Sequence, residues 1–167
     1  MIQAMRVGER KAANDTPGKA HLQRRSKLAR RLQPLLPLKN ILVVDDSDLE
    51  ATALLAMLRL VIGHDTAYHH SKTLIDARRV IEAAAPDVIF LDDRLGHSVS
   101  AEVSVARIKA FGFTGRPILL SGILTRTRKI ELMKLEVADI IHKDDLDAVR
   151  IMEAVLLALG VDKADIG

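Results

Sequence analysis

Apolar and polar residues follow one another along most of the chain in blocks typical of alternating strands and helices. Short apolar runs typical of β-strands lie at 41–44, 65–70, 87–93, 117–122 and 138–146, the second weaker than the others. Segments with apolar residues at helical spacing follow them, at 48–63, 71–85, 98–112, 125–137 and 146–160. Because most of the strands are apolar throughout, the pattern predicts a parallel sheet in an α/β fold, with helices covering both faces.

The same pattern gives detailed expectations for three of the helices. Asp48 is expected to cap the first helix of this series, and Ser71 the second, because short polar side chains satisfy the free N–H groups at a helix start. In the segment 125–137, helical spacing predicts that Ile130, Met133 and Val137 face the core.

Residues 1–38 have a different character. They hold Pro34, Pro37 and a Pro17-Gly18 pair, and their only helix-like stretch is Lys19–Gln33, which Pro34 is expected to end. We therefore divide the chain into an N-terminal arm and linker (1–38), one α/β domain (39–160) and a C-terminal tail (161–167), with no further domain expected after Gly160.

Charge supports this division and composition excludes several functions. The arm carries nine Lys/Arg against two acidic residues, whereas the remainder has a net charge of −4, so the chain totals +3. With 2% aromatic residues, binding of bases by stacking is disfavoured. Without cysteine there are no disulfides, thiolate zinc sites or cysteine nucleophiles. No apolar run reaches the roughly 18–20 residues of a membrane span, and no signal peptide is evident, so we expect a soluble cytoplasmic protein.

Candidate chemistry gathers at the strand ends. Asp45 and Asp46 end the first strand, Asp92 the third, Ser121 the fourth and Lys143 the fifth. The carboxyl ends of neighbouring parallel strands meet at one edge of a sheet, about 4.8 Å apart, so we expect these side chains to cluster. Three carboxylates repel one another unless a divalent cation such as Mg²⁺ binds, and an ammonium with a hydroxyl suits a phosphoryl group.

Four motifs carry a resemblance to a known family. "VVDD" (43–46), "PDVIFLDDRL" (86–95), "PILLSG" (117–122) and "ADIIHKDDL" (138–146) follow one another in the order and spacing of the receiver domain of two-component response regulators. From Asn40 to about Gly160 the chain resembles such a domain. The resemblance implies a doubly wound five-stranded parallel sheet of strand order 2-1-3-4-5.

The resemblance also implies roles for the acidic residues. Asp92 would accept a phosphoryl group from a sensor histidine kinase or a phosphotransfer protein. Asp46 and Asp92 would coordinate Mg²⁺ directly, together with the backbone carbonyl of Arg94, while Asp45 would act through a bound water. Such a module promotes its own phosphorylation and dephosphorylation but is not otherwise an enzyme, and it signals through protein–protein contacts.

The remaining positions match the family in part. Ser121 and Lys143 stand where the family has residues that contact the phosphoryl group. Asp144 replaces the proline that usually follows the lysine, so a trans peptide bond is expected there. Ile140 replaces a switch aromatic, which predicts an altered readout, and Gly96 replaces a proline, which predicts a more flexible loop.

Other polar residues are expected to have ordinary roles. Asp93 follows Asp92 on a strand and points to the opposite face, so we expect it to be solvated or one step removed from the site. His69 and His70 face opposite ways for the same reason and are not expected to share a metal ion.

The arm is expected to pack on protein, and two alternative functions stay open. We expect it to dock through its apolar residues on the acidic body of its own chain or of a second copy, and to support a homodimer; these residues are Leu28, Leu32, Leu35 and Leu36. The first alternative is a nucleic-acid-associated regulator in which the basic arm binds phosphates. The second is a receiver-like scaffold that works without phosphorylation.

Overall fold

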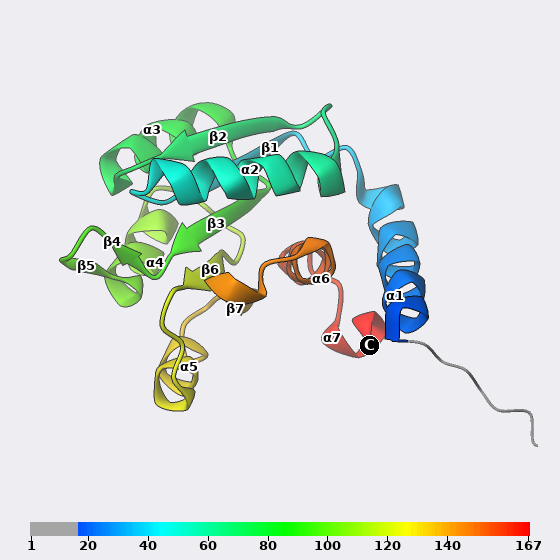
Figure 1. Cartoon of the computed structure of the whole chain (residues 1–167). Helices are drawn as coiled ribbons and strands as arrows, with labels where there is room; N and C mark the ends of the chain where they lie inside the picture. Colours follow the sequence, from blue (N-terminus) through cyan, green and yellow to red (C-terminus); the bar gives the residue numbers. More distant parts are fainter. Residues whose placement is uncertain (1–16) are drawn as a thin grey trace, which may run out of the picture.

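The computed structural model describes residues 17–167 (Figure 1), so the first sixteen residues of the arm lie outside it. Five parallel strands form the central sheet: β1 (Asn40–Val44), β2 (Ala67–Ser71), β3 (Val88–Asp92), β6 (Ile118–Ser121) and β7 (Asp139–His142). Their order in the sheet is β2-β1-β3-β6-β7. Counting these five strands along the chain, the order is 2-1-3-4-5, which confirms the fold expected from the sequence.

Helices cover both faces of this sheet. They are α1 (Pro17–Leu32), α2 (Asp48–Ile62), α3 (Leu74–Ala84), α4 (Ala101–Ala110), α5 (Arg126–Leu132), α6 (Ala148–Ala158) and α7 (Lys163–Ile166). Ile41 and Val43 pack in one apolar cluster with α2 and α6, whereas Leu42 and Val44 pack in a second with α3 and α4. Successive side chains on a strand point to opposite faces, so a run that is apolar throughout fits this two-sided core.

Two helix starts differ from the expectation. Ser47 caps α2 by accepting a hydrogen bond from the Glu50 amide, and Asp48 already belongs to the first helical turn. Thr73 caps α3, because Ser71 is still the last residue of β2. In both cases the observed capping residue lies within two positions of the predicted one. Where the preceding segment ends decides which polar residue caps the helix.

The inward face of α5 was predicted wrongly. Ile130 and Met133 are 52% and 65% exposed, whereas Leu132 is fully buried in the cluster with Ile140. The helix ends at Leu132, its one buried residue. Val137 lies beyond the helix end but packs, partly buried, against the same cluster, as predicted. A helix this short is oriented by its neighbours more than by its own periodicity.

The arm packs on its own chain. Leu28 and Leu32 of α1 are fully buried in the cluster that contains α6, and Leu36 is partly buried against it. Leu35, which was expected to dock with them, is exposed. Figure 1 shows α1 (blue) beside α7 (red), near the C-terminus, and Ile166 of α7 is buried in the same cluster. The helix α6 is therefore covered by α1 as well as by the sheet.

A small hairpin follows β3 that the sequence pattern did not indicate. It pairs β4 (Arg94–Leu95) with β5 (Val99–Ser100), antiparallel, at the edge of the domain. Gly96 turns the chain with φ of +60°, a backbone conformation that glycine adopts without strain. Its greater flexibility stays a prediction. Separately, no helix within residues 17–167 has the length and apolar character needed to cross a bilayer.

Candidate functional site

Three carboxylates meet at the carboxyl edge of the sheet. Asp45 and Asp46 directly follow β1, and Asp92 is the last residue of the neighbouring strand β3. One carboxylate oxygen from each lies within 4.8 Å of the others. Asp45 and Asp92 are 2% and 7% exposed, whereas Asp46 is open to solvent. The structure therefore brings together the acidic residues that the strand endings indicated.

Lys143 lies opposite these carboxylates, in the 3₁₀ turn η2 (Lys143–Asp145) that follows β7. Its Nζ lies 3.1 Å from Asp45 Oδ2 and 3.4 Å from Asp92 Oδ1, and it also pairs with Glu50. Glu50 is a fourth carboxylate that the sequence reasoning missed. Its position in the first turn of the helix that begins beside Asp46 was the available signal.

Burial and charge shift the ionisation of these groups. Burial raises the pKa of Asp92 from its ordinary 3.8 to about 6, with smaller contributions from the charges of Asp45 and Asp93, while Lys143 opposes the shift. Burial likewise raises the pKa of Asp45. Burial alone would lower the pKa of Lys143, but its carboxylate partners, Glu50 first, raise it instead.

Backbone groups hold the acidic residues in place. The Ser47 amide donates to Asp45 Oδ1 at 2.8 Å, and the Arg94 amide donates to Asp92 Oδ1 at 3.3 Å. The main chain of Arg94 therefore adjoins the Asp92 carboxylate. In residues 17–167 the cis peptide bond is that before Pro37, so Lys143 and Asp144 are joined in trans, as expected.

The two histidines of β2 take separate partners. His69 Nε2 is 2.9 Å from the side-chain oxygen of Asn40, and His70 Nε2 is 2.8 Å from the backbone oxygen of Asp45. They do not converge on one point, in agreement with the expectation that they share no metal ion. His70 instead supports the loop that carries Asp45.

Ser121 does not contact the three carboxylates. Its hydroxyl lies 2.8 Å from Asp93 Oδ2 and 2.9 Å from the Ile123 carbonyl oxygen. Asp93 is 5% exposed, so it is not solvated, and its contact with Ser121 fits the other expectation, a residue one step removed from the site. The Asp93 amide donates to Leu120 at the end of the adjacent strand β6, which places the carboxylate beside Ser121.

Ile140 is buried on β7 and packs in the cluster that contains Leu132. Its backbone oxygen accepts a hydrogen bond from Arg150 at 3.3 Å. An aliphatic side chain therefore fills this position in the core. An altered readout at Ile140 stays a prediction.

The donor set fits a hard divalent cation. The available ligands are the carboxylate oxygens of Asp45, Asp46 and Asp92, and the main chain of Arg94 adjoins them. Mg²⁺ prefers oxygen ligands, commonly one or two carboxylates with water and phosphate oxygens completing the shell. The exposed side chain of Asp46 leaves the cluster open to solvent on one side, as ligand entry requires.

Comparison with known proteins gives structural matches only. No protein-family model matches the sequence, and no curated protein does. The signal receiver domain of a protein assigned as a Luxo repressor, from Vibrio parahaemolyticus, is similar over 74% of this chain and 91% of its own, with 23% identity and a TM-score of 0.62. The BeF3-activated N-terminal receiver domain of Klebsiella pneumoniae RstA is similar over 73% of this chain and 99% of its own, with 22% identity and a TM-score of 0.61. A response regulator receiver domain protein from Clostridium thermocellum has 19% identity over 73% of this chain and 94% of its own, with a TM-score of 0.62.

This chain has the receiver-domain fold.

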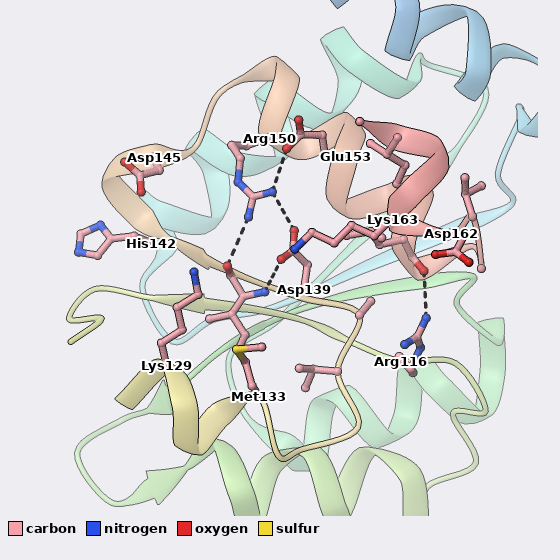
Figure 2. A pocket seen from close by; sticks show the side chains of 18 of the residues that line it. Arg116, Lys129, Met133, Asp139, His142, Asp145, Arg150, Glu153, Asp162 and Lys163 are labelled. Carbon is pink, nitrogen blue, oxygen red and sulfur yellow. Dashed lines mark hydrogen bonds and ion pairs between the residues drawn. The ribbon is translucent and has the colours of Figure 1, made fainter. Parts of the chain in front are cut away.

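A separate hollow of about 920 Å³ lies between α5, β7, α6 and α7 (Figure 2), away from the three carboxylates. Three of its charged side chains pair with one another: Arg150 lies 2.9 Å from Asp139 and 3.1 Å from Glu153. Arg24 of α1 also pairs with Glu153, so the network ties the arm to β7. Within residues 17–167 the group of side chains able to hold a metal ion is the carboxylate cluster, so the cluster is the stronger candidate for chemistry.

Proposed function

We propose that the chain is a response regulator receiver module that accepts a phosphoryl group on Asp92 and signals through protein–protein contacts. The observation that carries the proposal is the set of three carboxylates within 4.8 Å of one another, faced by the Lys143 ammonium, on a receiver fold. The donor would be a sensor histidine kinase or a phosphotransfer protein, since receiver domains receive phosphate from phosphohistidine. A cytoplasmic location stays a prediction.

The proposed reaction is phosphoryl transfer to a carboxylate. An Asp92 oxygen bonds to phosphorus while the bond between phosphorus and the donor's histidine nitrogen breaks, and the electron pair leaves on that nitrogen. The product is an acyl phosphate on Asp92. Attack of water on phosphorus later restores the carboxylate, releases inorganic phosphate and yields a proton to solvent. With its pKa at about 6, Asp92 is mostly ionised near neutral pH and can act as the nucleophile.

The chain's own groups would orient and neutralise the reacting oxygens. Lys143 can turn from its carboxylate partners to a phosphoryl oxygen, because its Nζ already lies 3.4 Å from Asp92 Oδ1. Mg²⁺, when bound, would add positive charge beside the transferring oxygens. Asp46, Asp92 and the Arg94 carbonyl would hold the ion, and Asp45 would hold one of its waters.

Acetyl phosphate with Mg²⁺ tests the proposal. We expect one phosphoryl group per chain, which borohydride trapping and mass mapping assign to Asp92, and no label on Asp92→Asn. Asp46→Ala should lose the labelling, whereas Asp48→Ala should keep it because Asp48 pairs with Lys72 outside the carboxylate cluster. A label on Asp93, or none at saturating Mg²⁺, contradicts the proposal. Incubation with a panel of phosphorylated histidine kinases then identifies the donor.

A second candidate function rests on α1. This helix carries six Lys/Arg and no acidic residue, and all of its side chains except Leu28 and Leu32 are exposed. Docking on α6 holds these positive charges at one surface of the molecule. We propose nucleic-acid binding as the alternative role of this surface, driven by phosphate contacts and therefore weakened steeply by salt.

A homodimer supported by the arm is also a proposal. Leu28 and Leu32 were expected at its interface, but they are buried against α6 of the same chain. Leu22 and Leu35 stay exposed beside them and are the apolar side chains on which a second copy could pack.

A further inference from the structure

The Ser121 hydroxyl is held by a carboxylate that the proposed phosphoryl transfer does not use. Ser121 ends β6 and is fully buried, and its Oγ lies 2.8 Å from Asp93 Oδ2 and 2.9 Å from the Ile123 carbonyl oxygen. A hydroxyl has one proton, so it donates to one of these acceptors at a time. An ionised carboxylate is the stronger acceptor, which favours Asp93.

Asp93 is fixed beside Ser121 by the sheet. The Asp93 amide donates to Leu120 at 2.8 Å, which extends the pairing of β3 with β6 by one residue. Asp92 and Asp93 are successive residues of an extended segment and have different partners: Lys143 for Asp92, Ser121 for Asp93. The Ser121 hydroxyl is therefore directed to Asp93 and not to the neighbouring Asp92.

The buried Asp93 carboxylate has the positive charge of Arg128 nearby. The guanidinium of Arg128 on α5 makes a bidentate pair with Glu102 of α4, at 2.6 and 3.3 Å. The Glu102 hydrogen bond is the main cause of the raised pKa of Arg128, and the charge of Asp93 adds to it. Arg128 hydrogen-bonds Glu102 and Glu131 and acts on Asp93 through its charge alone. The hydrogen bond from Ser121 is therefore the direct contact of the Asp93 carboxylate.

We propose that Asp93 is a positioning residue that holds the Ser121 hydroxyl away from Asp92 and so opposes its contact with a phosphoryl group there. The inference rests on the proposed function, and on the role that the family resemblance implies for Ser121, contact with the phosphoryl group. Because the hydroxyl cannot donate to both acceptors, its contact with a phosphoryl oxygen requires the hydrogen bond to Asp93 to break. Any factor by which the Asp93–Ser121 hydrogen bond is stabilised therefore lowers the stability of the contact between Ser121 and a phosphoryl group by the same factor.

Beryllofluoride, which binds carboxylates as a phosphoryl mimic, measures this coupling in the full chain. Its affinity with saturating Mg²⁺ is determined by titration calorimetry for wild type, Asp93→Ala, Ser121→Ala and the double variant. We expect Asp93→Ala to tighten binding about tenfold when Ser121 is present, which corresponds to about 1.4 kcal/mol. In the Ser121→Ala background the gain should be much smaller, since only the repulsion between Asp93 and the bound anion is relieved.

Asp93→Asn separates the hydroxyl contact from the charge. Asparagine keeps an oxygen acceptor for Ser121 and loses the negative charge, so it should retain most of the coupling to Ser121. Equal gains in both Ser121 backgrounds, or a loss of thermal stability with unchanged affinity, would overturn the inference and leave Asp93 as a purely structural partner. If wild type binds no beryllofluoride and Asp92 takes no label from acetyl phosphate, the proposed function fails first. If wild type binds and is labelled, only the role of Asp93 is at stake.

Discussion

Replacing Asp92 by asparagine should stabilise the metal-free protein at neutral pH, although Asp92 is the centre of the candidate site. Burial raises its pKa from 3.8 to about 6, so the folded chain holds the proton more tightly than the unfolded chain does. A group of this kind contributes its full stability below about pH 4 and loses it as the pH rises through about 6. The difference corresponds to about 3 kcal/mol, at about 1.36 kcal/mol per pKa unit.

The variant removes the titrating group and keeps its shape. We expect Asp92→Asn to match wild type at pH 4 and to be more stable by about 2–3 kcal/mol at pH 7 in the presence of a chelator. Urea denaturation followed by circular dichroism is suitable, because the chain has no tryptophan to report by fluorescence. At a typical slope of about 1–3 kcal/mol per molar urea, the midpoint at pH 7 should rise by about 1 M or more.

Asp65→Asn is the matched control, because Asp65 lies on the exposed loop before β2 and the substitution is chemically the same. It should shift the midpoint equally at both pH values. A variant at Asp92 that is no more stable than wild type at pH 7, or that gains as much at pH 4, would refute the argument that the buried charge is costly. Saturating Mg²⁺ should cancel the advantage of the variant, since the ion would bind the wild-type carboxylates.

Further predictions concern the arm. Leu28→Ala should lower the free energy of unfolding by about 3 kcal/mol, as expected for a fully buried leucine, whereas Leu22→Ala on the exposed face should change it little; urea denaturation measures both. If the two variants behave alike, α1 does not pack on α6 in solution. Arg30→Gln with Arg31→Gln should weaken DNA binding and flatten its salt dependence in titrations at low and moderate salt, and equal binding by wild type and variant contradicts the nucleic-acid alternative. Sedimentation equilibrium tests the homodimer: Leu22→Glu should reduce the mass of a dimer that uses the exposed side of α1, and a wild-type monomer at all concentrations excludes it.

The sequence by itself determined the sheet and the carboxylate cluster. The runs that form β1, β3 and β6 are apolar throughout, which predicts interior parallel strands, and the carboxyl ends of such strands meet at one edge. Asp45, Asp46, Asp92 and Lys143 were therefore placed together by local pattern and topology alone. The position of Ser121 at the end of β6 was fixed in the same way, but its hydrogen-bond partner was not.

Only the tertiary structure decided contacts between segments that are remote in sequence. Glu50 and Lys143 are separated by 93 positions, and Arg24 and Glu153 by 129. The spacing of its leucines predicts that α1 has an apolar side. That this side packs against α6 depends on the apolar surface that α6 leaves uncovered by the sheet. The same holds for α5, where Leu132 and not Ile130 enters the core, and for Asp93, whose partner Ser121 lies on the neighbouring strand. Local pattern fixes which residues can be buried, while the free energy of packing and pairing between distant segments fixes which of them are buried and against what.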